Sequence, residues 1–357
     1  MSARADRLVA RLPQMGAELL MVTSLVNVRY LTGYTGSNGL ALIGPDTRLF
    51  FTDFRYTDQS AAEVDSAFER RISTLDLLDG VAEALPGGPL RLGFEDAHLT
   101  VRSHARLREI VPQTVELAAA GDAVESLRAV KEPGEIQRIA AATSVADAAL
   151  RQVMEQGLVG RTEIEVATAL ERAMRDLGAQ RPSFDSIVAG GPHGALPHAQ
   201  PRDVEIGAGE LVVIDWGAEL DGYCSDCTRT LATGELSDPA REIYELVLEA
   251  QLTGLQAVRA GISGRDADAA ARRVIEAAGH GKHFGHGLGH GVGMEIHEGP
   301  RLSQRSDAVL AASNVVTVEP GVYLAGEFGV RIEDLVVVAE TGCDILTSLP
   351  KDLIIVG

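Results

Sequence analysis

Two acidic residues lie within one predicted β-hairpin in the second half of the chain. The stretch 211–230 reads LVVIDWGAELDGYCSDCTRT, in which strand-like runs flank Asp221-Gly222. Asp-Gly is typical of a hairpin turn, so we expect Asp215 and Asp226 on the two strands and on one face of the sheet. Diagonal neighbours of this kind lie about 7–8 Å apart at the backbone. The two carboxylates could share a cation, or they could be hairpin-end residues in water.

A second predicted hairpin, NVVTVEPGVYLAGEFGVRIEDLVVV, carries two glutamates. Glu319 and Glu333 are equidistant from its expected turn and could face each other across it. The sequence offset that brings GLVGR at 157–161 onto GISGR at 261–265 also brings Asp215 onto Glu319. This repeat indicates that the second half is a diverged copy of the first. Each copy should then contribute acids to one shared site.

A glycine-rich segment with several histidines, FGHGLGHGVGMEIHEGP, lies between the two hairpins. Its alternating glycines disfavour a helix and permit an extended backbone that approaches its neighbours closely. In an extended chain His286, Leu288 and His290 point the same way. A single histidine is more often structural than a ligand, but four acids converging on the same site favour a histidine ligand.

The acids and a histidine form an oxygen-rich donor set, namely Asp215, Asp226, His290, Glu319 and Glu333. The set is too acidic for structural zinc and suits Mn²⁺, Co²⁺ or Fe²⁺. Its negative charge balances two divalent ions. Two such ions roughly 3.5–4 Å apart can bridge a water, lower its pKa and present hydroxide to a carbonyl. The predicted reaction class is metal-assisted hydrolysis.

The composition is that of an ordinary globular protein. The 357 residues are 45% hydrophobic and 23% charged, and the net charge of −19 argues against nucleic acid or an anionic membrane as a partner. The chain shows no apolar run of membrane-spanning length and no signal-peptide core in MSARADRLVARLPQ, so we expect a cytoplasmic protein. Cys224 and Cys227 form C-x-x-C, but residues three apart on a strand point to opposite faces. Buried thiols are the better interpretation, because no second cysteine pair completes a zinc site.

The elements that must position these residues form two predicted domains, 1–121 and 122–357. Alternating helix and strand patterns predict a small α/β domain first, and the composition shift at ELAAAGD marks its end. Strands are expected at Glu18–Val22, Gly39–Ile43, Arg48–Phe51 and Arg91–Phe94, and helices at Leu8–Met15, Tyr56–Val64 and Val101–Ile110. In the second domain, Pro133 is expected at a first helical position, and Thr162 with Glu165 form a capping-box signature.

These residues and their contexts closely resemble the aminopeptidase P and prolidase branch of the "pita-bread" metallopeptidases. The resemblance is strong from Leu127 to Val338 and looser through LTGYTGSNG and FTDFRY. It implies an α+β protein in which a smaller α/β creatinase-like N-terminal domain precedes a C-terminal pita-bread (creatinase/aminopeptidase) fold with an internal pseudo-two-fold repeat. It also implies a homodimer in which one N-terminal domain borders the partner's active site.

The resemblance further implies cleavage of the bond before proline by a hydroxide that bridges two divalent ions. Mn²⁺ is the first choice, with Co²⁺, Fe²⁺ or Zn²⁺ as alternatives. Substrates would be Xaa-Pro dipeptides or longer peptides with proline at the second position. Asp215 would bind one ion, His290 and Glu319 the other, and Asp226 and Glu333 both. Glu319 would also shuttle the proton of the bridging water.

Other matching residues receive roles around the metals. His297, in EIHEGP, would donate a hydrogen bond to the developing oxyanion, and His198, in LPHAQP, would contact the substrate beside the scissile bond. His286 would line the proline pocket. Arg331, two residues before a ligand and on its face, would orient the acids. Arg301 resembles the arginine with which prolidases hold a dipeptide carboxylate, or it is a surface residue of PRLSQRS.

Two other classes of protein stay open at this point. One is a creatinase-like hydrolase that works without metal, and the other is a non-catalytic scaffold that has lost its ligands. The intact ligand set argues against both. Peptide length is also open, since YTGSNG and TDFRY resemble aminopeptidase P, which accepts longer peptides. His193 has no family counterpart and is expected to be a loop residue.

Overall fold

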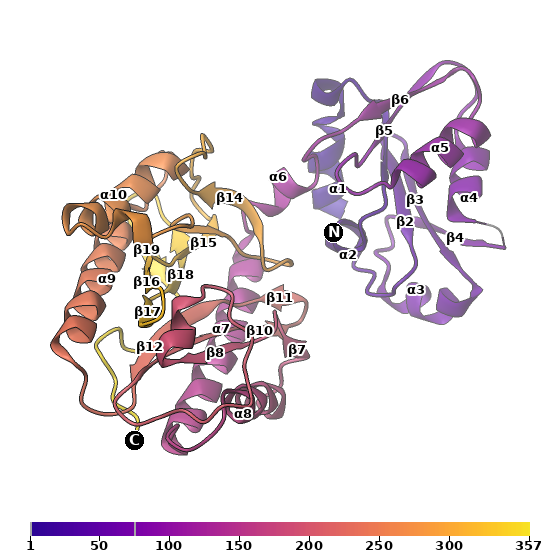
Figure 1. Cartoon of the computed structure of the whole chain (residues 1–357). Helices are drawn as coiled ribbons and strands as arrows, with labels where there is room; N and C mark the ends of the chain where they lie inside the picture. Colours follow the sequence, from indigo (N-terminus) through magenta and orange to yellow (C-terminus); the bar gives the residue numbers. More distant parts are fainter. Residues whose placement is uncertain (1, 75) are drawn as a thin grey trace. The chain divides into compact units, whose positions relative to one another are not determined.

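The structure is a computed structural model that describes residues 2–74 and 76–357. The chain divides into two compact units, Met1–Arg128 and Ala129–Gly357 (Figure 1). The composition shift at ELAAAGD predicts a domain boundary after residue 121. The run ELAAAGD that suggested it is partly regular structure, because Val115–Ala119 form strand β6 at the end of a sheet.

Within the described residues, unit 1 contains a six-stranded mixed sheet in the order β4-β3-β2-β1-β5-β6. Its other strands are β1 (Leu19–Val22), β2 (Leu40–Gly44), β3 (Thr47–Asp53), β4 (Glu69–Ser73) and β5 (Leu90–Phe94). Its helices are α1 (Ser2–Val9), η1 (Leu12–Met15), α2 (Leu25–Thr32), η2 (Phe54–Tyr56), α3 (Thr57–Glu63), α4 (Leu77–Ala84), α5 (Val101–Ile110) and α6 (Glu125–Arg128). The predicted strands are confirmed. Strand β4 was not predicted, because this exposed edge strand reads ERRIS and lacks apolar alternation.

Unit 2 contains two helix pairs, one for each copy of the repeat (Figure 1). The helices are α7 (Pro133–Glu155), α8 (Glu163–Asp176), α9 (Asp238–Ala257) and α10 (Gly264–Ala277), with the short turns η3 (Gly191–Ala195) and η4 (Gly281–His283). Pro133 lies in the first turn of α7, and Thr162 and Glu165 form the predicted capping box of α8. Ser263 caps α10 through one hydrogen bond, in which its hydroxyl accepts the Asp266 N–H at 3.0 Å. The described helices are not long and apolar enough for any of them to cross a membrane.

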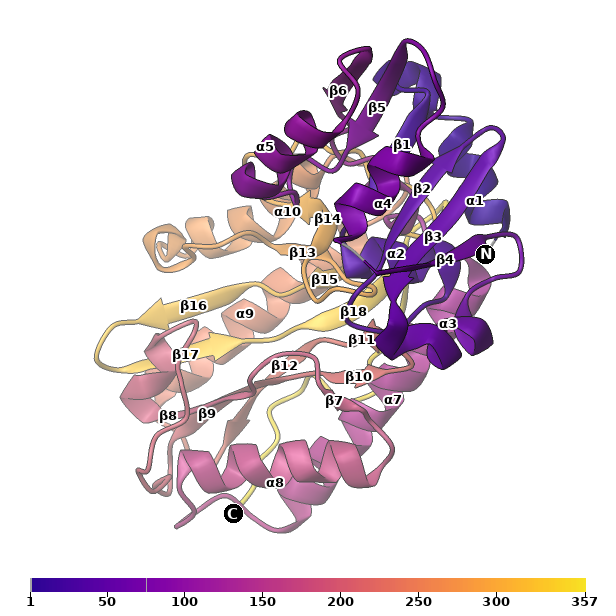
Figure 2. The same ribbon diagram turned by 90° about the vertical axis from the view of Figure 1, so that its right-hand side faces the viewer.

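Each helix pair is followed by strands that include one of the two predicted hairpins (Figure 2). The first copy contains β7 (Arg181–Pro182), β8 (Ile187–Gly190), β9 (Leu211–Trp216), β10 (Ala218–Leu220), β11 (Tyr223–Cys224) and β12 (Cys227–Ala232). The second contains β13 (Gly289–Gly291), β14 (Glu298–Leu302), β15 (Val315–Val318), β16 (Gly321–Leu324), β17 (Phe328–Arg331), β18 (Asp334–Val338) and β19 (Cys343–Ile345). The pita-bread fold with its internal repeat is therefore confirmed.

The first hairpin turns at Asp221 and Gly222, whose φ angles are 50° and 76°. Two positive φ angles are what a type I′ turn requires, and Asp-Gly supplies them readily. One detail of the prediction is wrong, because Asp226 lies in a two-residue break between β11 and β12 rather than on a regular strand. At this break the backbone that carries the Asp226 side chain is outside the regular strand pairing.

The second hairpin is interrupted in the same way. Val318 pairs with Asp334 and Gly321 pairs with Arg331, and both pairs share one register. This register places Glu319 across from Glu333, as the sequence predicted. Like Asp226, both glutamates lie between regular strands, where the strand ladder is broken, whereas Asp215 is paired within β9.

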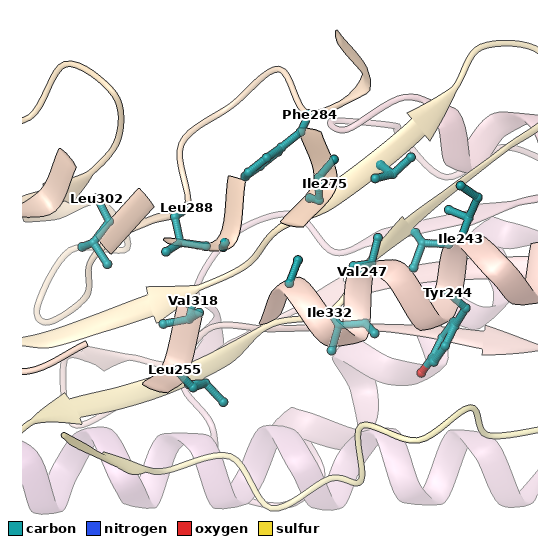
Figure 3. Close-up of a cluster of buried hydrophobic side chains, with 14 of the residues drawn as sticks. Ile243, Tyr244, Val247, Leu255, Ile275, Phe284, Leu288, Leu302, Val318 and Ile332 are labelled. Carbon is teal, nitrogen blue, oxygen red and sulfur yellow. The ribbon is translucent and has the colours of Figure 1, made fainter. Parts of the chain in front are cut away.

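The hydrophobic core of unit 2 lies beneath these hairpins. One buried cluster lies under the second copy and includes Leu255 on α9, Val318 on β15, and Leu288 (Figure 3). Trp216 belongs to the core of the first copy, where its Nε1 donates to the Ala146 carbonyl at 2.8 Å. Full burial of such side chains stabilises the fold by about 1.5–3 kcal/mol each. The sheets that carry the acids therefore have a rigid apolar backing.

Candidate active site

The structure brings the five predicted ligands together in unit 2. Asp215 on β9, Asp226 and Glu333 place carboxylate oxygens within 4.8 Å of one another. The His290 Nε2 atom lies 3.3 Å from Glu319 Oε1 and 3.5 Å from Asp226 Oδ2. Acids from both copies of the repeat thus face one space, as a shared site requires.

The glycines around His290 are needed for this approach. A Cβ at Gly289 would lie 2.0 Å from the Thr317 carbonyl oxygen, and one at Gly291 would lie 2.2 Å from that of Gly299. His290 Nδ1 contacts the Gly291 carbonyl oxygen at 3.0 Å. Because a carbonyl can only accept, Nδ1 carries the proton and Nε2 presents its lone pair to the acids.

The glycine-rich segment is not extended along its whole length, and one expectation about it is wrong. Leu288 is buried in the core, whereas His286 lines the cavity, so the two side chains do not point the same way. Asp268 on α10 accepts the Leu288 N–H at 3.0 Å. Arg272, paired with Asp268, donates to the carbonyls of Phe284 and His286. These side-chain contacts bend the backbone, which breaks the alternation of an extended chain.

The acids repel one another in a buried site. Burial, and next the neighbouring carboxylates, hold the pKa of Asp226 and of Glu333 well above the ordinary range. Burial also raises the pKa of Glu319. Burial lowers the pKa of His290 to about 4, so its ring is neutral at neutral pH and can act as a ligand.

One buried arginine offsets part of this negative charge. Arg331 Nη2 lies 2.7 Å from Asp215 Oδ2, and its Nε donates to Thr228 Oγ1 at 2.9 Å. Thr228 Oγ1 in turn donates to Glu333 Oε2 at 2.7 Å. Arg331 therefore orients two of the acids, directly and through a hydroxyl. A single guanidinium does not balance the four carboxylates.

Two acid oxygens show what the donor set is suited to hold. Among the described residues, buried Asp215 Oδ1 and Glu333 Oε1 have no hydrogen-bond partner. An unpaired carboxylate oxygen is costly to bury unless a cation or a donor satisfies it. Oxygen-rich sets with one imidazole suit divalent ions of the Mn²⁺ type. The residues therefore fit divalent metal ions.

The predicted substrate residues line a cavity of about 640 Å³ next to the acids. They are His198, His286, His297 and Arg301. His286 Nε2 contacts the Tyr323 hydroxyl at 2.9 Å, and the His297 ring lies 4.4 Å from the His290 ring. Phe184 and Ile187 add apolar surface to the wall.

Sequence reasoning missed three polar partners of the site. Thr228 donates to Glu333, and Thr317 donates to Glu319 and accepts the His290 N–H. The Tyr323 hydroxyl contacts His286 and accepts from Arg331. Strand alternation could have found two of them. Thr228 lies two residues after Asp226, Thr317 lies two before Glu319, and residues two apart on a strand share a face. His193 and the two cysteines lie outside the cavity lining, and the cysteines are free thiols, as expected.

A pita-bread fold whose cavity gathers four acids and a neutral histidine defines a metal-dependent hydrolase. Comparison with known proteins agrees, since residues 137–340 match the metallopeptidase family M24 and residues 4–130 match the Creatinase/Prolidase N-terminal domain. The chain belongs to metallopeptidase family M24.

Similar proteins match along almost their whole length. The Xaa-Pro dipeptidase of Pyrococcus furiosus is 36% identical, over 99% of this chain and 100% of that protein. The structure of an Xaa-Pro dipeptidase from Bacillus anthracis is 41% identical and superposes with a TM-score of 0.95, with 99% of each chain covered. The structure of an X-Pro aminopeptidase from Thermotoga maritima is 38% identical with a TM-score of 0.90, over 99% of this chain and 100% of that one.

Proposed function

We propose that this enzyme is a dinuclear-metal Xaa-Pro peptidase, which hydrolyses the peptide bond between an N-terminal residue and proline. The observation that carries the proposal is the buried cluster of four carboxylates and one neutral histidine, in which two acid oxygens accept no hydrogen bond from the described residues. The printed names of the similar proteins, Xaa-Pro dipeptidase and X-Pro aminopeptidase, support the choice of bond.

In this proposal Asp215 would hold one divalent ion, His290 and Glu319 would hold the second, and Asp226 and Glu333 would hold both. When bound, two such ions supply ionised water at neutral pH and polarise the scissile carbonyl. Mn²⁺ is the first choice, with Co²⁺, Fe²⁺ or Zn²⁺ as alternatives. Glu319 would accept the proton of the attacking water and pass it to the nitrogen of the leaving proline. Thr317 orients the Glu319 carboxylate by donating to its Oε1 atom at 2.8 Å.

The histidines that line the cavity act on the substrate. His297 is neutral, because burial and then the nearby His290 lower its pKa to about 4. A neutral ring can donate one N–H to the oxyanion that forms at the scissile carbonyl. His198 contacts the substrate beside the scissile bond. His286, held by Tyr323, lines the pocket for the proline ring.

Arg301 decides how well dipeptides bind. It lies on β14 across from His290 in the strand register and lines the cavity. A guanidinium binds a carboxylate bidentately and stays charged at every physiological pH. We assign to it the free carboxylate of a bound dipeptide. The enzyme would cleave Xaa-Pro dipeptides as well as longer peptides.

The proposal is tested by measuring proline release from Ala-Pro, and release of alanine from Ala-Pro-Ala, with the full chain. Complete chelation should abolish both activities, and Mn²⁺ should restore them. Ala-Ala is the matched control, which should be a poor substrate because it lacks the proline ring. Hydrolysis that survives chelation would support a metal-free creatinase-like enzyme. Absence of hydrolysis with each of the four metals would support a non-catalytic scaffold.

A further inference from the structure

The segment 190–202 carries His198 beside the cavity but has little regular structure of its own. Apart from Gly190 at the end of β8, its regular structure is the short turn η3, and Leu196 and His198 are exposed. It also supplies the Pro197 carbonyl, which accepts a hydrogen bond from Arg331 Nη1 at 3.1 Å. Because Arg331 pairs with Asp215, the position of this loop bears on both the substrate side and the acid side of the site.

One buried carboxylate ties together the two ends of this segment. Glu163, the first residue of α8, is 1% exposed. Its Oε1 atom accepts the backbone N–H of Gly190 at 3.0 Å, and its Oε2 atom accepts that of Arg202 at 2.9 Å. The loop is therefore closed through a single side chain on a neighbouring helix.

Two side chains from within the segment complete the contacts of Glu163. His193 Nδ1 lies 3.0 Å and 2.9 Å from the two carboxylate oxygens. Arg202 donates to both oxygens, through Nε at 3.1 Å and Nη2 at 3.0 Å. Bidentate arginine pairs of this kind are strong and directional. Burial alone would raise the pKa of Glu163, but these hydrogen bonds hold it below its ordinary value.

The start of helix α8 does not need this carboxylate. Thr162 and Glu165 already form its capping box, in which each side chain accepts a backbone N–H of the other residue. The donors that Glu163 satisfies come from the loop and from the end of β8, outside the helix. The hydrogen bonds that Glu163 accepts therefore hold the loop and not the helix.

We propose that Glu163 is a positioning residue that fixes the segment 190–202, and with it His198, beside the substrate cavity. It acts through Gly190, His193 and Arg202, and we call these contacts of Glu163 the clamp. Glu163 does not touch the substrate. The proposal rests on the Xaa-Pro peptidase function, because it requires His198 to contact the substrate. His193, to which the sequence assigned no role, is part of the clamp.

The test is the variant Glu163→Gln, with Glu165→Gln as the matched control on the same turn of α8. In Glu163→Gln, hydrogen exchange at Gly190, Arg202 and the residues between them should become roughly tenfold faster or more. The kcat/KM for Ala-Pro should fall roughly 10- to 100-fold, while bound metal is retained. In a His198→Ala background, Glu163→Gln should have little further effect, since the two residues act as a unit. Glu165→Gln should change neither loop exchange nor kcat/KM.

The outcomes separate this inference from the proposed function. If the wild-type protein does not hydrolyse Ala-Pro, the proposed function is wrong. The assignment of His198 to substrate contact is then wrong as well. Unchanged loop exchange in Glu163→Gln would overturn the clamp itself, whatever the activity. Fully additive losses of Glu163→Gln and His198→Ala would also overturn it. If Glu163→Gln does not fold, Arg202→Gln removes two donors at an exposed residue and should shift exchange and kcat/KM in the same direction by less.

Discussion

At the level of single residues, His290 and His297 divide two tasks that a neutral imidazole can perform. Burial lowers the pKa of each ring to about 4, so neither carries charge at neutral pH. His290 donates from Nδ1 to a backbone carbonyl and so presents an Nε2 lone pair. His297 lines the cavity and can offer an N–H to a substrate. A protonated His290 ring would have no lone pair to offer a metal ion, so its neutral state is a condition for acting as a ligand.

We expect His297→Ala to lower kcat for Ala-Pro far more than it raises KM. A donor to an oxyanion acts mainly in the transition state, and loss of one such donor typically costs roughly 2.7–4 kcal/mol. Steady-state kinetics with Mn²⁺-loaded enzyme measure the split. His297→Gln, which keeps a donor, is the control and should retain more activity. A change confined to KM would make His297 a binding residue only.

Arg301→Ala should weaken dipeptide cleavage by about 1.5–3 kcal/mol in kcat/KM, the range for hydrogen bonds to charged groups. A tripeptide carries its carboxylate elsewhere and should lose much less. The measured quantity is the ratio of kcat/KM for Ala-Pro to that for Ala-Pro-Ala, which must fall. The exposed Arg305, which follows β14, does not line the cavity, so Arg305→Ala should leave the ratio unchanged. Equal losses on both substrates would remove Arg301 as a sensor of peptide length.

At the level of elements, the sequence predicted the parts whose local signals agree with the fold. Asp221-Gly222 set the first turn, and equal spacing predicted that Glu319 faces Glu333. The prediction was wrong or incomplete where contacts between distant segments decide the structure. Leu288 turns into the core because α10 holds the backbone around it, and no local pattern encodes that contact. The clamp at Glu163 also depends on residues far apart in the chain.

The loop held by Glu163 should depend on pH in a defined direction. The pKa of Glu163 is lowered in the folded protein, so its stabilisation is complete above the ordinary glutamate pKa of about 4.3 and is lost as pH falls through the folded value. The groups that face it are His193 and Arg202, with Glu210 beside Gly190.

The difference in melting temperature between wild type and Glu163→Gln measures this effect. It should stay constant from about pH 5.5 to 7.5 and shrink below about pH 4.3. Subtracting the two proteins removes the acid sensitivity of the other carboxylates. A difference that stays constant or grows on acidification would show that the ionised form of Glu163 does not stabilise the fold.

At the scale of the whole molecule, the site lies in unit 2, and acids from both copies of its repeat form it. Repulsion between these acids works against holding the two copies together when no cation is bound. Unit 1 has a core of its own, with Met21, Leu42 and Phe51 among its members. The homodimer and the cytoplasmic location stay predictions.

Metal binding should therefore stabilise unit 2. Trp216 is the single tryptophan and is buried in unit 2, so its emission reports on that unit, whereas circular dichroism reports on both. Mn²⁺ at a hundredfold excess over its dissociation constant should add about 2.7 kcal/mol, which is roughly 5–10 °C in the Trp216 melting midpoint. Chelation should reverse the shift.

Asp226→Asn is the control for this linkage, because Asp226 is proposed to hold both ions. The variant should lose hydrolysis and most of its Mn²⁺-dependent shift. Replacing one of several buried like charges by a neutral amide also relieves repulsion, so the metal-free variant should melt at or above metal-free wild type. A full Mn²⁺ shift in Asp226→Asn would refute its bridging role. Equal Trp216 midpoints of chelated and Mn²⁺-loaded wild type would mean that its hairpin is rigid without metal, and the repulsion argument would fail.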